Sequence, residues 1–277
     1  MLSGKTTLIA HLGYPTEAFK APLIYNPWFE KNGIDAMVVP MGVKAEDYPV
    51  SLRQIFKFSN VLGALVTMPH KVTTMTLADE ATITAKIAGA ANALIKRADG
   101  SLLADQFDGA GFARGVARKG FKTKGSRILI VGTGGVGCPI AASLAADGAA
   151  SISLFDVNTA SAEGLASRLR TYYPDMEVRV TSNDPAGYDL VVNATPLGMK
   201  PDDPLPFDVT RLSPSTFVGE VVMKKEVTPM LRAAAERGCN YVVGTDMLFE
   251  MIPAYLEFFG FGTATPEELR AVAKIEY

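Results

Sequence analysis

The stretch Arg127-Ile-Leu-Ile-Val-Gly-Thr-Gly-Gly-Val-Gly-Cys-Pro-Ile-Ala141 decides the fold of this chain. Its apolar, β-branched part, Ile128 to Val131, ends abruptly at a glycine, which is typical of a buried parallel strand. The glycines that follow satisfy the pattern G-x-G-x-x-G, and the residues from Val136 to Ala146 predict a helix. A strand, a glycine-rich turn and a helix in this order predict the phosphate-binding turn of a Rossmann domain.

Each glycine of the pattern has a physical role. We expect Gly132 to make the tight turn, Gly134 to let the backbone approach a pyrophosphate, and Gly137 to let helix and strand pack closely. The amino end of the helix offers unpaired N–H groups and the positive end of its dipole to the phosphates. A second predicted strand, residues 151–155, ends at Asp156, an acid suited to accept a hydrogen bond from the ribose 2′-hydroxyl. The sequence therefore predicts a bound dinucleotide.

The residues after that second strand favour NAD over NADP. The carboxylate of Asp156 would repel a 2′-phosphate, whereas it can accept hydrogen bonds from a free ribose diol. The next residue, Val157, offers no cation to a phosphate. We therefore expect NAD as the cofactor.

Composition excludes several classes of protein. The length of 277 residues predicts about two domains, and the 48% hydrophobic residues are ample for large cores. The 27 basic and 29 acidic residues nearly cancel and form no basic patch, so we expect neither a nucleic acid nor a membrane as partner. We find no signal peptide and no run of about 18 apolar residues, so we expect a cytoplasmic protein. Two cysteines and two histidines without a C-x-x-C motif predict reduced thiols and no metal site.

Residues 1–107 predict an α/β layer of their own, because strands and helices alternate there. The expected strands are 7–12, 35–43, 63–67, a strand from the turn at 89–92 to about 97, and 101–104. The expected helices are 22–31, 46–58, a helix after Met68-Pro-His-Lys71, and 82–87. Ser3-Gly-Lys-Thr-Thr7 resembles the end of a P-loop, but the sequence lacks the earlier glycine and strand of that motif. We interpret these residues as the frayed start of the first strand.

The second part continues the alternation. Its expected helices are 109–119, 136–146, 161–172, 228–238, 247–259 and 266–275, and its expected strands are 127–131, 151–155, 177–180, 190–193, 216–222 and 241–243. Thr228-Pro229 predicts the start of a helix, with threonine as N-cap and proline at the first helical position. The fold class is therefore α/β, with an N-terminal α/β domain and a C-terminal, doubly wound parallel sheet of Rossmann type.

Four segments resemble motifs of the shikimate dehydrogenase family. They are Val66-Thr-Met-Pro-His-Lys71 for N-V-T-x-P-x-K, Gly89-Ala-Ala-Asn92 for G-A-x-N-T, Asp108-Gly-Ala-Gly-Phe112 for the end of N-T-D-G-x-G-F, and Asn193-Ala-Thr-Pro-Leu-Gly-Met199 for N-A-T-x-x-G-M. They occur in order around the G-x-G-G-x-G turn and before a Gly244-x-x-Met247-Leu248 turn. The resemblance therefore runs across essentially the whole chain.

The resemblance implies two domains with a cleft between them. Residues 1–107 would form the substrate-binding and catalytic domain, with the helices of 247–277 packing back on it, and residues 108–246 the NAD-binding Rossmann domain. The implied reaction is reversible hydride transfer between a nicotinamide and the secondary alcohol of a small, polyhydroxylated cyclic acid such as shikimate or quinate. Lys71 and Asp108 match the catalytic pair of the family, and Thr67 and Asn92 match positions that hydrogen-bond ring hydroxyls.

The glycine-rich turn and the resemblance together imply a set of cofactor-binding residues. They are Gly132, Thr133, Gly134, Gly135, Val136, Gly137, Asp156, Asn193, Ala194, Thr195, Pro196, Leu197, Met199, Val221, Gly244, Met247 and Leu248.

The chemistry of alcohol oxidation suits the lysine and the aspartate. A base must take the hydroxyl proton as hydride departs, and a lysine can do so when a neighbour and partial desolvation hold it uncharged. A carboxylate favours the charged ammonium, so we interpret Asp108 as orienting the lysine and binding a substrate hydroxyl. Without the family motifs, Lys71 is equally a solvated lysine in a first helical turn and Asp108 a helix N-cap. In the same way, Thr67 is a strand threonine and Asn92 a turn asparagine.

The departures from the family lie in the substrate pocket. A serine pair, S-x-S, that grips the substrate carboxylate is replaced by Phe19 and Ala21; other replacements are Leu65, Gln106-Phe107, Met251 and the segment Glu220-Val-Val-Met223. Losing two charge-assisted hydrogen bonds costs about 3 kcal/mol or more, roughly a hundredfold in affinity. We therefore expect shikimate to be a poor substrate. Lys20, between the two positions, is either a replacement anchor or a solvated surface lysine.

A second function stays open at this point, that of a non-catalytic NAD-binding sensor or regulator on the same fold. The altered pocket motivates it, whereas the retained Lys71 and Asp108 argue against it, since binding alone requires neither. The chain lacks the Tyr-x-x-x-Lys of short-chain dehydrogenases, zinc ligands, and a histidine after His70 for a histidine-based mechanism. The sequence leaves open whether the protein is a monomer or a homodimer.

Overall fold

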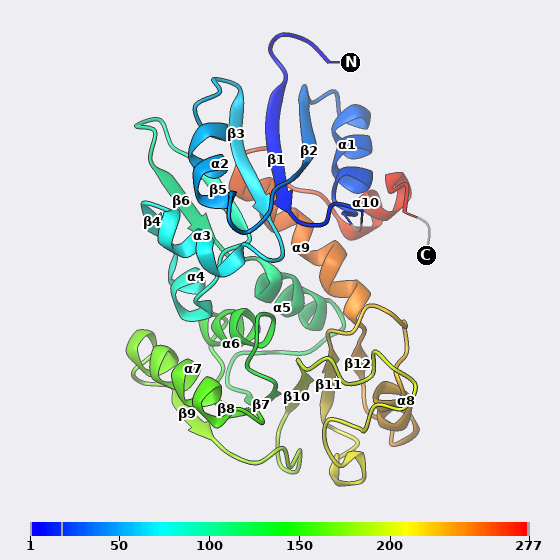
Figure 1. The fold of residues 1–277 in the computed structure, drawn as a ribbon. Helices are drawn as coiled ribbons and strands as arrows, with labels where there is room; N and C mark the ends of the chain where they lie inside the picture. The colour runs from blue at the N-terminus through cyan, green and yellow to red at the C-terminus, as the bar shows by residue number, and fades with distance from the viewer. Residues whose placement is uncertain (1, 18, 276–277) are drawn as a thin grey trace. The chain divides into compact units, whose positions relative to one another are not determined.

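The computed structural model describes residues 2–17 and 19–275, which form two α/β units (Figure 1). One unit contains the described residues up to Phe107 together with those from Ile252 onward, and the other contains Asp108–Met251. The predicted fold class is confirmed, because each unit is built around a six-stranded sheet covered by helices. No helix in the described ranges has both the length and the apolar composition that a membrane span requires.

The first unit has a mixed sheet in the order β2-β1-β3-β5-β6-β4. Its strands are β1 (Thr7–Gly13), β2 (Ala36–Gly42), β3 (Val61–Val66), β4 (Glu80–Ala81), β5 (Ala93–Lys96) and β6 (Leu102–Asp105). Its helices are α1 (Pro22–Lys31), α2 (Tyr48–Ile55), α3 (Lys71–Leu77), α4 (Ile83–Ala88), the later part of α9 (Gly244–Phe259), and α10 (Pro266–Val272). Strand β1 is parallel to β2 and β3, so the carboxyl ends of these three strands meet at one edge of the sheet.

Alternation along β1 assigns its residues to the two faces of this sheet. Ala10 and Leu12 join the core that also contains Tyr48 and Leu52 of α2. At the neighbouring strand, a Cβ added to Gly63 would lie 2.4 Å from a ring carbon of Phe259, so this glycine allows α9 to pack closely against β3.

The second unit has a fully parallel sheet in the order β12-β11-β10-β7-β8-β9. Its strands are β7 (Arg127–Val131), β8 (Ser151–Phe155), β9 (Glu177–Val180), β10 (Leu190–Asn193), β11 (Phe217–Glu220) and β12 (Tyr241–Val242). Its helices are α5 (Asp108–Arg118), α6 (Gly137–Ala146), α7 (Thr159–Tyr172), α8 (Pro229–Glu236) and the start of α9, with a 3-10 turn η1 (Val209–Arg211). This is the Rossmann order, in which the direction of winding reverses between β7 and β10 and ligands bind at the carboxyl ends of the strands.

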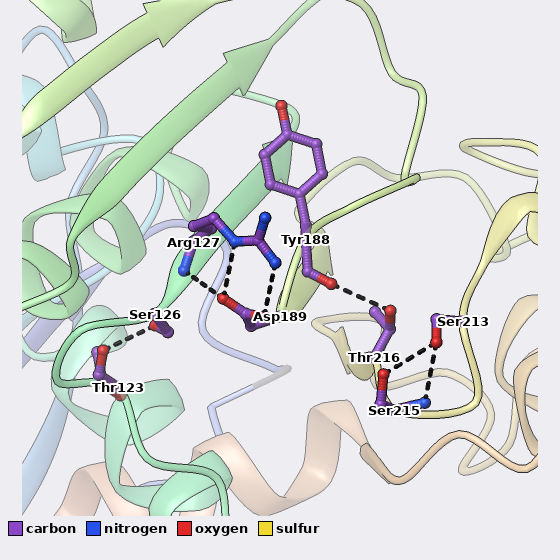
Figure 2. A network of polar contacts seen from close by, with 8 residues as sticks. All are labelled: Thr123, Ser126, Arg127, Tyr188, Asp189, Ser213, Ser215 and Thr216. Carbon is purple, nitrogen blue, oxygen red and sulfur yellow. Dashed lines mark hydrogen bonds and ion pairs between the residues drawn. The ribbon is translucent and has the colours of Figure 1, made fainter.

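A polar network ties together the amino ends of the central strands, away from that ligand-binding edge (Figure 2). The backbone N–H of Arg127 donates to Asp189 Oδ2 at 2.8 Å, and the Arg127 guanidinium pairs with the same carboxylate. Thr216 Oγ1 donates to the carbonyl oxygen of Tyr188 at 3.0 Å. Such exposed pairs add little stability, but these contacts hold β10 in register between β7 and β11.

The structure differs from the sequence-based expectation at several element ends. Helix α7 begins at Thr159, two residues early, because the Asn158 side chain caps it. Strand β11 ends at Glu220 rather than at residue 222, since the Glu220 carboxylate accepts the next two backbone N–H groups. Helix α9 begins at Gly244 rather than at residue 247. The two-residue strand β4 and the turn η1 were not expected.

Candidate functional site

Three predicted substrate-site residues lie together in the first unit, at the carboxyl end of β3. Thr67 follows the strand, Lys71 begins α3, and Asn92 precedes β5. Backbone hydrogen bonds hold the three segments in place: the N–H of His70 donates to Thr67 at 2.9 Å, that of Ala91 to Lys71 at 2.9 Å, and that of Val66 to Asn92 at 2.8 Å. Residues far apart in the sequence thus present a lysine, a threonine and an asparagine at one edge of the sheet.

Asn92 also fixes the chain that leads to the fourth predicted residue. Its side chain is 1% exposed, and its Oδ1 accepts the backbone N–H of Phe107 at 2.9 Å. Asp108 is the next residue and opens α5 of the second unit, where it is buried. The structure therefore gives Asn92 a second role, in addition to the predicted contact with substrate.

His70, directly before Lys71, anchors the start of α3 in the first unit. Its buried ring stacks on Tyr48 with a centroid distance of 3.9 Å, and its Nε2 is 2.8 Å from the carbonyl oxygen of Val43. Burial lowers the pKa of His70, and the hydrogen bond to Val43 opposes that effect. The sequence alone does not reveal this anchoring role, because it depends on Tyr48 and Val43, which no local pattern links to the lysine.

In the second unit, the glycine-rich turn contains two kinds of glycine: those that the fold requires and those that face open space. Gly132 has a φ of +100°, and a Cβ there would lie 2.8 Å from the carbonyl group of Ala194. A Cβ at Gly137 would lie 1.9 Å from the carbonyl oxygen of Gly132. By contrast, a Cβ at Gly134 or Gly135 would have no described atom within 4 Å. This bare backbone between β7 and α6 fits a pyrophosphate in the way expected of a Rossmann turn.

Asp156, the acid after β8, is held by this turn. Its Oδ2 accepts the N–H of Thr133 at 2.7 Å and the Thr133 hydroxyl at 3.0 Å, and its Oδ1 accepts the N–H of Asn158 at 2.8 Å. Partial burial raises the pKa of Asp156, but these hydrogen bonds outweigh it, and the pKa lies below its usual range. The carboxylate is therefore charged at neutral pH. The adjacent Val157 is 94% exposed.

The loop after β10 is organised by the buried amide of Asn193. Its Oδ1 accepts the N–H of Thr195 at 3.1 Å and the Thr195 hydroxyl at 2.6 Å, while its Nδ2 donates to the carbonyl oxygen of Leu197 at 3.0 Å. The N–H of Leu197 in turn donates to Thr195 Oγ1. The motif resembling N-A-T-x-x-G-M thus forms a closed turn beside Gly132.

Glu220, the first residue of a segment that departs from the family pattern, joins this loop to two other segments. The side chain is 0% exposed, and Oε1 accepts from Asn193 Nδ2 at 3.1 Å and from the N–H groups of Val221 and Val222. Its Oε2 accepts the hydroxyl of Thr228, the N-cap of α8, at 2.9 Å. Burial raises the pKa of Glu220, and the four hydrogen bonds oppose that rise. The sequence marked Glu220 only as a departure and missed this linking role.

The remaining predicted cofactor residues lie in the same unit. A Cβ at Gly244 would lie 2.3 Å from the carbonyl oxygen of Val222, so the start of α9 packs against the segment after β11. Val136 precedes α6; Ala194, Pro196 and the exposed Met199 follow β10; Val221 follows β11; Met247 and Leu248 lie in α9. The described part of the chain holds no group of three or more histidine, cysteine or acidic side chains suited to a metal.

Comparisons with known proteins agree with this arrangement. Residues 12–94 match the family model described as the shikimate dehydrogenase substrate binding domain. The chain is 32% identical over 270 residues to a shikimate dehydrogenase (NADP(+)) of a Jannaschia species, covering 94% of each protein. A solved shikimate 5-dehydrogenase of Listeria monocytogenes, in complex with shikimate and NAD, is similar with a TM-score of 0.91 and 25% identity, over 98% of this chain and 97% of that one. A quinate dehydrogenase of Corynebacterium glutamicum, in complex with NAD, has a TM-score of 0.86 and 26% identity, over 96% and 98%.

Proposed function

Because the chain belongs to the shikimate dehydrogenase family, we propose that it is a NAD-dependent oxidoreductase acting on a polyhydroxylated ring compound related to shikimate and quinate. The nicotinamide, when bound, exchanges a hydride with the carbon of a secondary alcohol. The observation that carries this proposal is the grouping of Lys71, Thr67 and Asn92 at one sheet edge of the first unit. A site that served only to bind would not require the lysine.

The residues divide the chemistry between them. Lys71 takes the hydroxyl proton during oxidation and returns it during reduction. Thr67 and Asn92 orient the substrate through its hydroxyls, and Asp108 is the acid that matches the catalytic pair of the family. The backbone of Gly134 and Gly135 receives the pyrophosphate, while the loops after β10 and β11 and the start of α9 hold the nicotinamide end.

The preference for NAD over NADP rests on Asp156 and Val157. The carboxylate of Asp156 stays charged because Thr133 and Asn158 donate hydrogen bonds to it. A 2′-phosphate beside it would meet like charge, and the exposed apolar side chain of Val157 offers no compensation. The cofactor proposed for this protein thus differs from the NADP(+) that the curated relative is named for. A higher kcat/KM with NADP than with NAD would refute this part of the proposal.

The substrate pocket favours a compound other than shikimate itself. Phe19 and Ala21 stand where the family has its serine pair, and neither side chain donates a hydrogen bond to a carboxylate. We expect weaker binding of shikimate by about a hundredfold relative to enzymes that keep both serines.

The experiment that tests the function is a screen of NAD reduction with shikimate, quinate and related polyhydroxylated rings, followed by Lys71→Ala on the best substrate. We expect the lysine variant to lose about 10²- to 10⁴-fold in kcat while its affinity for NAD stays the same. A wild-type protein that binds NAD but oxidises none of these compounds would instead favour a sensor. Undiminished turnover in the variant would exclude Lys71 as the base.

A further inference from the structure

Four residues gather around the carboxyl end of β1, and one of them, Thr67, is also proposed to orient the substrate. These residues, His11, Gly13, Phe19 and Thr67, are called the His11 cluster below. His11 and Gly13 are two residues apart on one strand and therefore share a face of the sheet. The ring of His11 stacks on that of Phe19 with a centroid distance of 4.0 Å and an interplanar angle of 27°.

Gly13 brings this aromatic pair next to the expected substrate residue Thr67. A Cβ at Gly13 would lie 2.8 Å from Cζ of Phe19 and 2.5 Å from Cγ2 of Thr67. Any larger residue at position 13 would therefore push one of these side chains away. Phe19 occupies one of the two positions where the family has serine. A small molecule that contacts Thr67 can therefore contact Phe19 as well.

The cluster is uncharged at neutral pH and contains an unsatisfied polar atom. Burial lowers the pKa of His11 to about 4, so its imidazole is neutral at pH 7. The side chain is 8% exposed, and its Nδ1 has no hydrogen-bond partner in the part of the chain that the structure describes. An unpaired polar atom in a buried position is costly, so a ligand hydroxyl that bonded to it would remove that cost.

The same features disfavour a carboxylate. The face of a phenylalanine ring carries partial negative charge. A carboxylate placed against Phe19 and Ala21 would leave water without the two hydroxyl donors of the family's serine pair, and incomplete replacement of its hydration is costly. An uncharged polyhydroxylated compound suits the cluster better. Its C–H groups can pack on the Phe19 ring, and its hydroxyl groups can form hydrogen bonds.

We propose that the His11 cluster is a specificity subsite that selects uncharged, polyhydroxylated substrates over carboxylic acids. In this subsite the C–H groups of the substrate pack on Phe19, and one of its hydroxyls bonds to Nδ1 of His11 once the Phe19 ring turns aside. The inference rests on the proposed function and refines it, because it replaces the expected cyclic acid by a neutral relative.

The test compares a matched pair of compounds, shikimate and its methyl ester, which share the ring and the secondary alcohol and differ in charge. Neutral cyclic polyols such as inositols extend the series. We expect the wild-type protein to have a kcat/KM for the ester at least about tenfold above that for the acid, since the acid would place its charge against the Phe19 ring without the two serine donors of the family. A higher kcat/KM for the acid overturns the inference while the proposed function stands.

Restoring the serine pair should reverse this preference. In Phe19→Ser with Ala21→Ser, we expect the KM for shikimate to fall by about a hundredfold and the ester to lose its advantage. Phe58→Ser is the matched control, because Phe58 belongs to the same unit but is 63% exposed, and it should leave the ratio unchanged. An unaltered ratio in the serine variant refutes the role of Phe19.

His11→Leu tests the hydrogen bond separately. We expect the KM for the neutral substrate to rise about fivefold or more with little change in kcat, in keeping with one lost hydrogen bond. If none of the screened ring compounds is oxidised, this ester and the inositols included, the proposed function fails. Calorimetric binding of the matched pair to the NAD-loaded protein still decides the inference. Tighter binding of the ester supports the subsite, whereas equal or tighter binding of the acid refutes it.

Discussion

The lowered pKa of His11 has a measurable consequence for the stability of the protein. Its pKa is 6.5 in an unfolded chain and about 4 in the folded protein, because burial disfavours the charged imidazolium. As the pH falls below 6.5, the unfolded state therefore binds a proton that the folded state refuses until about pH 4. The difference corresponds to about 3 kcal/mol of unfolding free energy, present above pH 6.5 and lost by pH 4.

The perturbation that isolates this effect is His11→Leu, which removes the titrating group. Urea unfolding of both proteins, measured at intervals from pH 7 to pH 4, gives the free energy of unfolding at each pH. Other groups, including His70 and the carboxylates, titrate in both proteins and cancel in the difference. We expect the wild-type protein to lose about 3 kcal/mol more than the variant over this range. Parallel curves would mean that burial does not shift the pKa of His11, and the proposed subsite would then lose the desolvated environment on which it rests.

Further predictions concern the second unit. Gly134→Ala should leave the unfolding free energy within about 0.5 kcal/mol of the wild type, because its Cβ has open space, but should weaken NAD binding at least about tenfold in calorimetry, since the pyrophosphate needs that space. Gly137→Ala should lower the unfolding free energy by more than about 2 kcal/mol, because its Cβ would clash with the carbonyl oxygen of Gly132. Equal stability of the two variants would contradict the distinction between glycines that the fold requires and glycines that face open space. Glu220→Gln turns an acceptor oxygen into a donor among four donors. We therefore expect the unfolding free energy in urea to fall by about 1–3 kcal/mol and NAD binding to weaken. Unchanged stability and NAD affinity would contradict the linking role of this carboxylate. Asp156→Asn with Val157→Arg should shift the ratio of kcat/KM values towards NADP, and an unshifted ratio would count against the charge argument.

Local patterns were sufficient where structure depends on residues close in sequence. The strand from Arg127 to Val131, its glycine turn and the helix that follows formed as expected, because apolar periodicity and glycine spacing act over a few residues. Helix α8 begins after Thr228 as its N-cap sequence predicts.

Local patterns failed where a distant group competes for the backbone. The apolar residues after Glu220 favour a longer strand, but the buried carboxylate takes the N–H groups that would have extended it. Burial of that carboxylate depends on Asn193 and Thr228, which only the folded sheet brings to the same place. In the same way, Phe19 stands out in the sequence as a departure from the family, but no local pattern indicates that it stacks on His11.

The sequence by itself determined the two α/β units, the cofactor turn, the family and the identity of the lysine and acid expected to do the chemistry. These properties depend on short motifs and on the alternation of strands and helices, both of which involve residues close in sequence. Tertiary structure alone decided that His11 is neutral and that its Nδ1 has no hydrogen-bond partner among the described residues. It also decided that His70 anchors the start of α3 and that Glu220 joins three segments. The physical reason is that burial and hydrogen-bond partners are properties of the folded neighbourhood, and that neighbourhood is made of residues far apart in the chain.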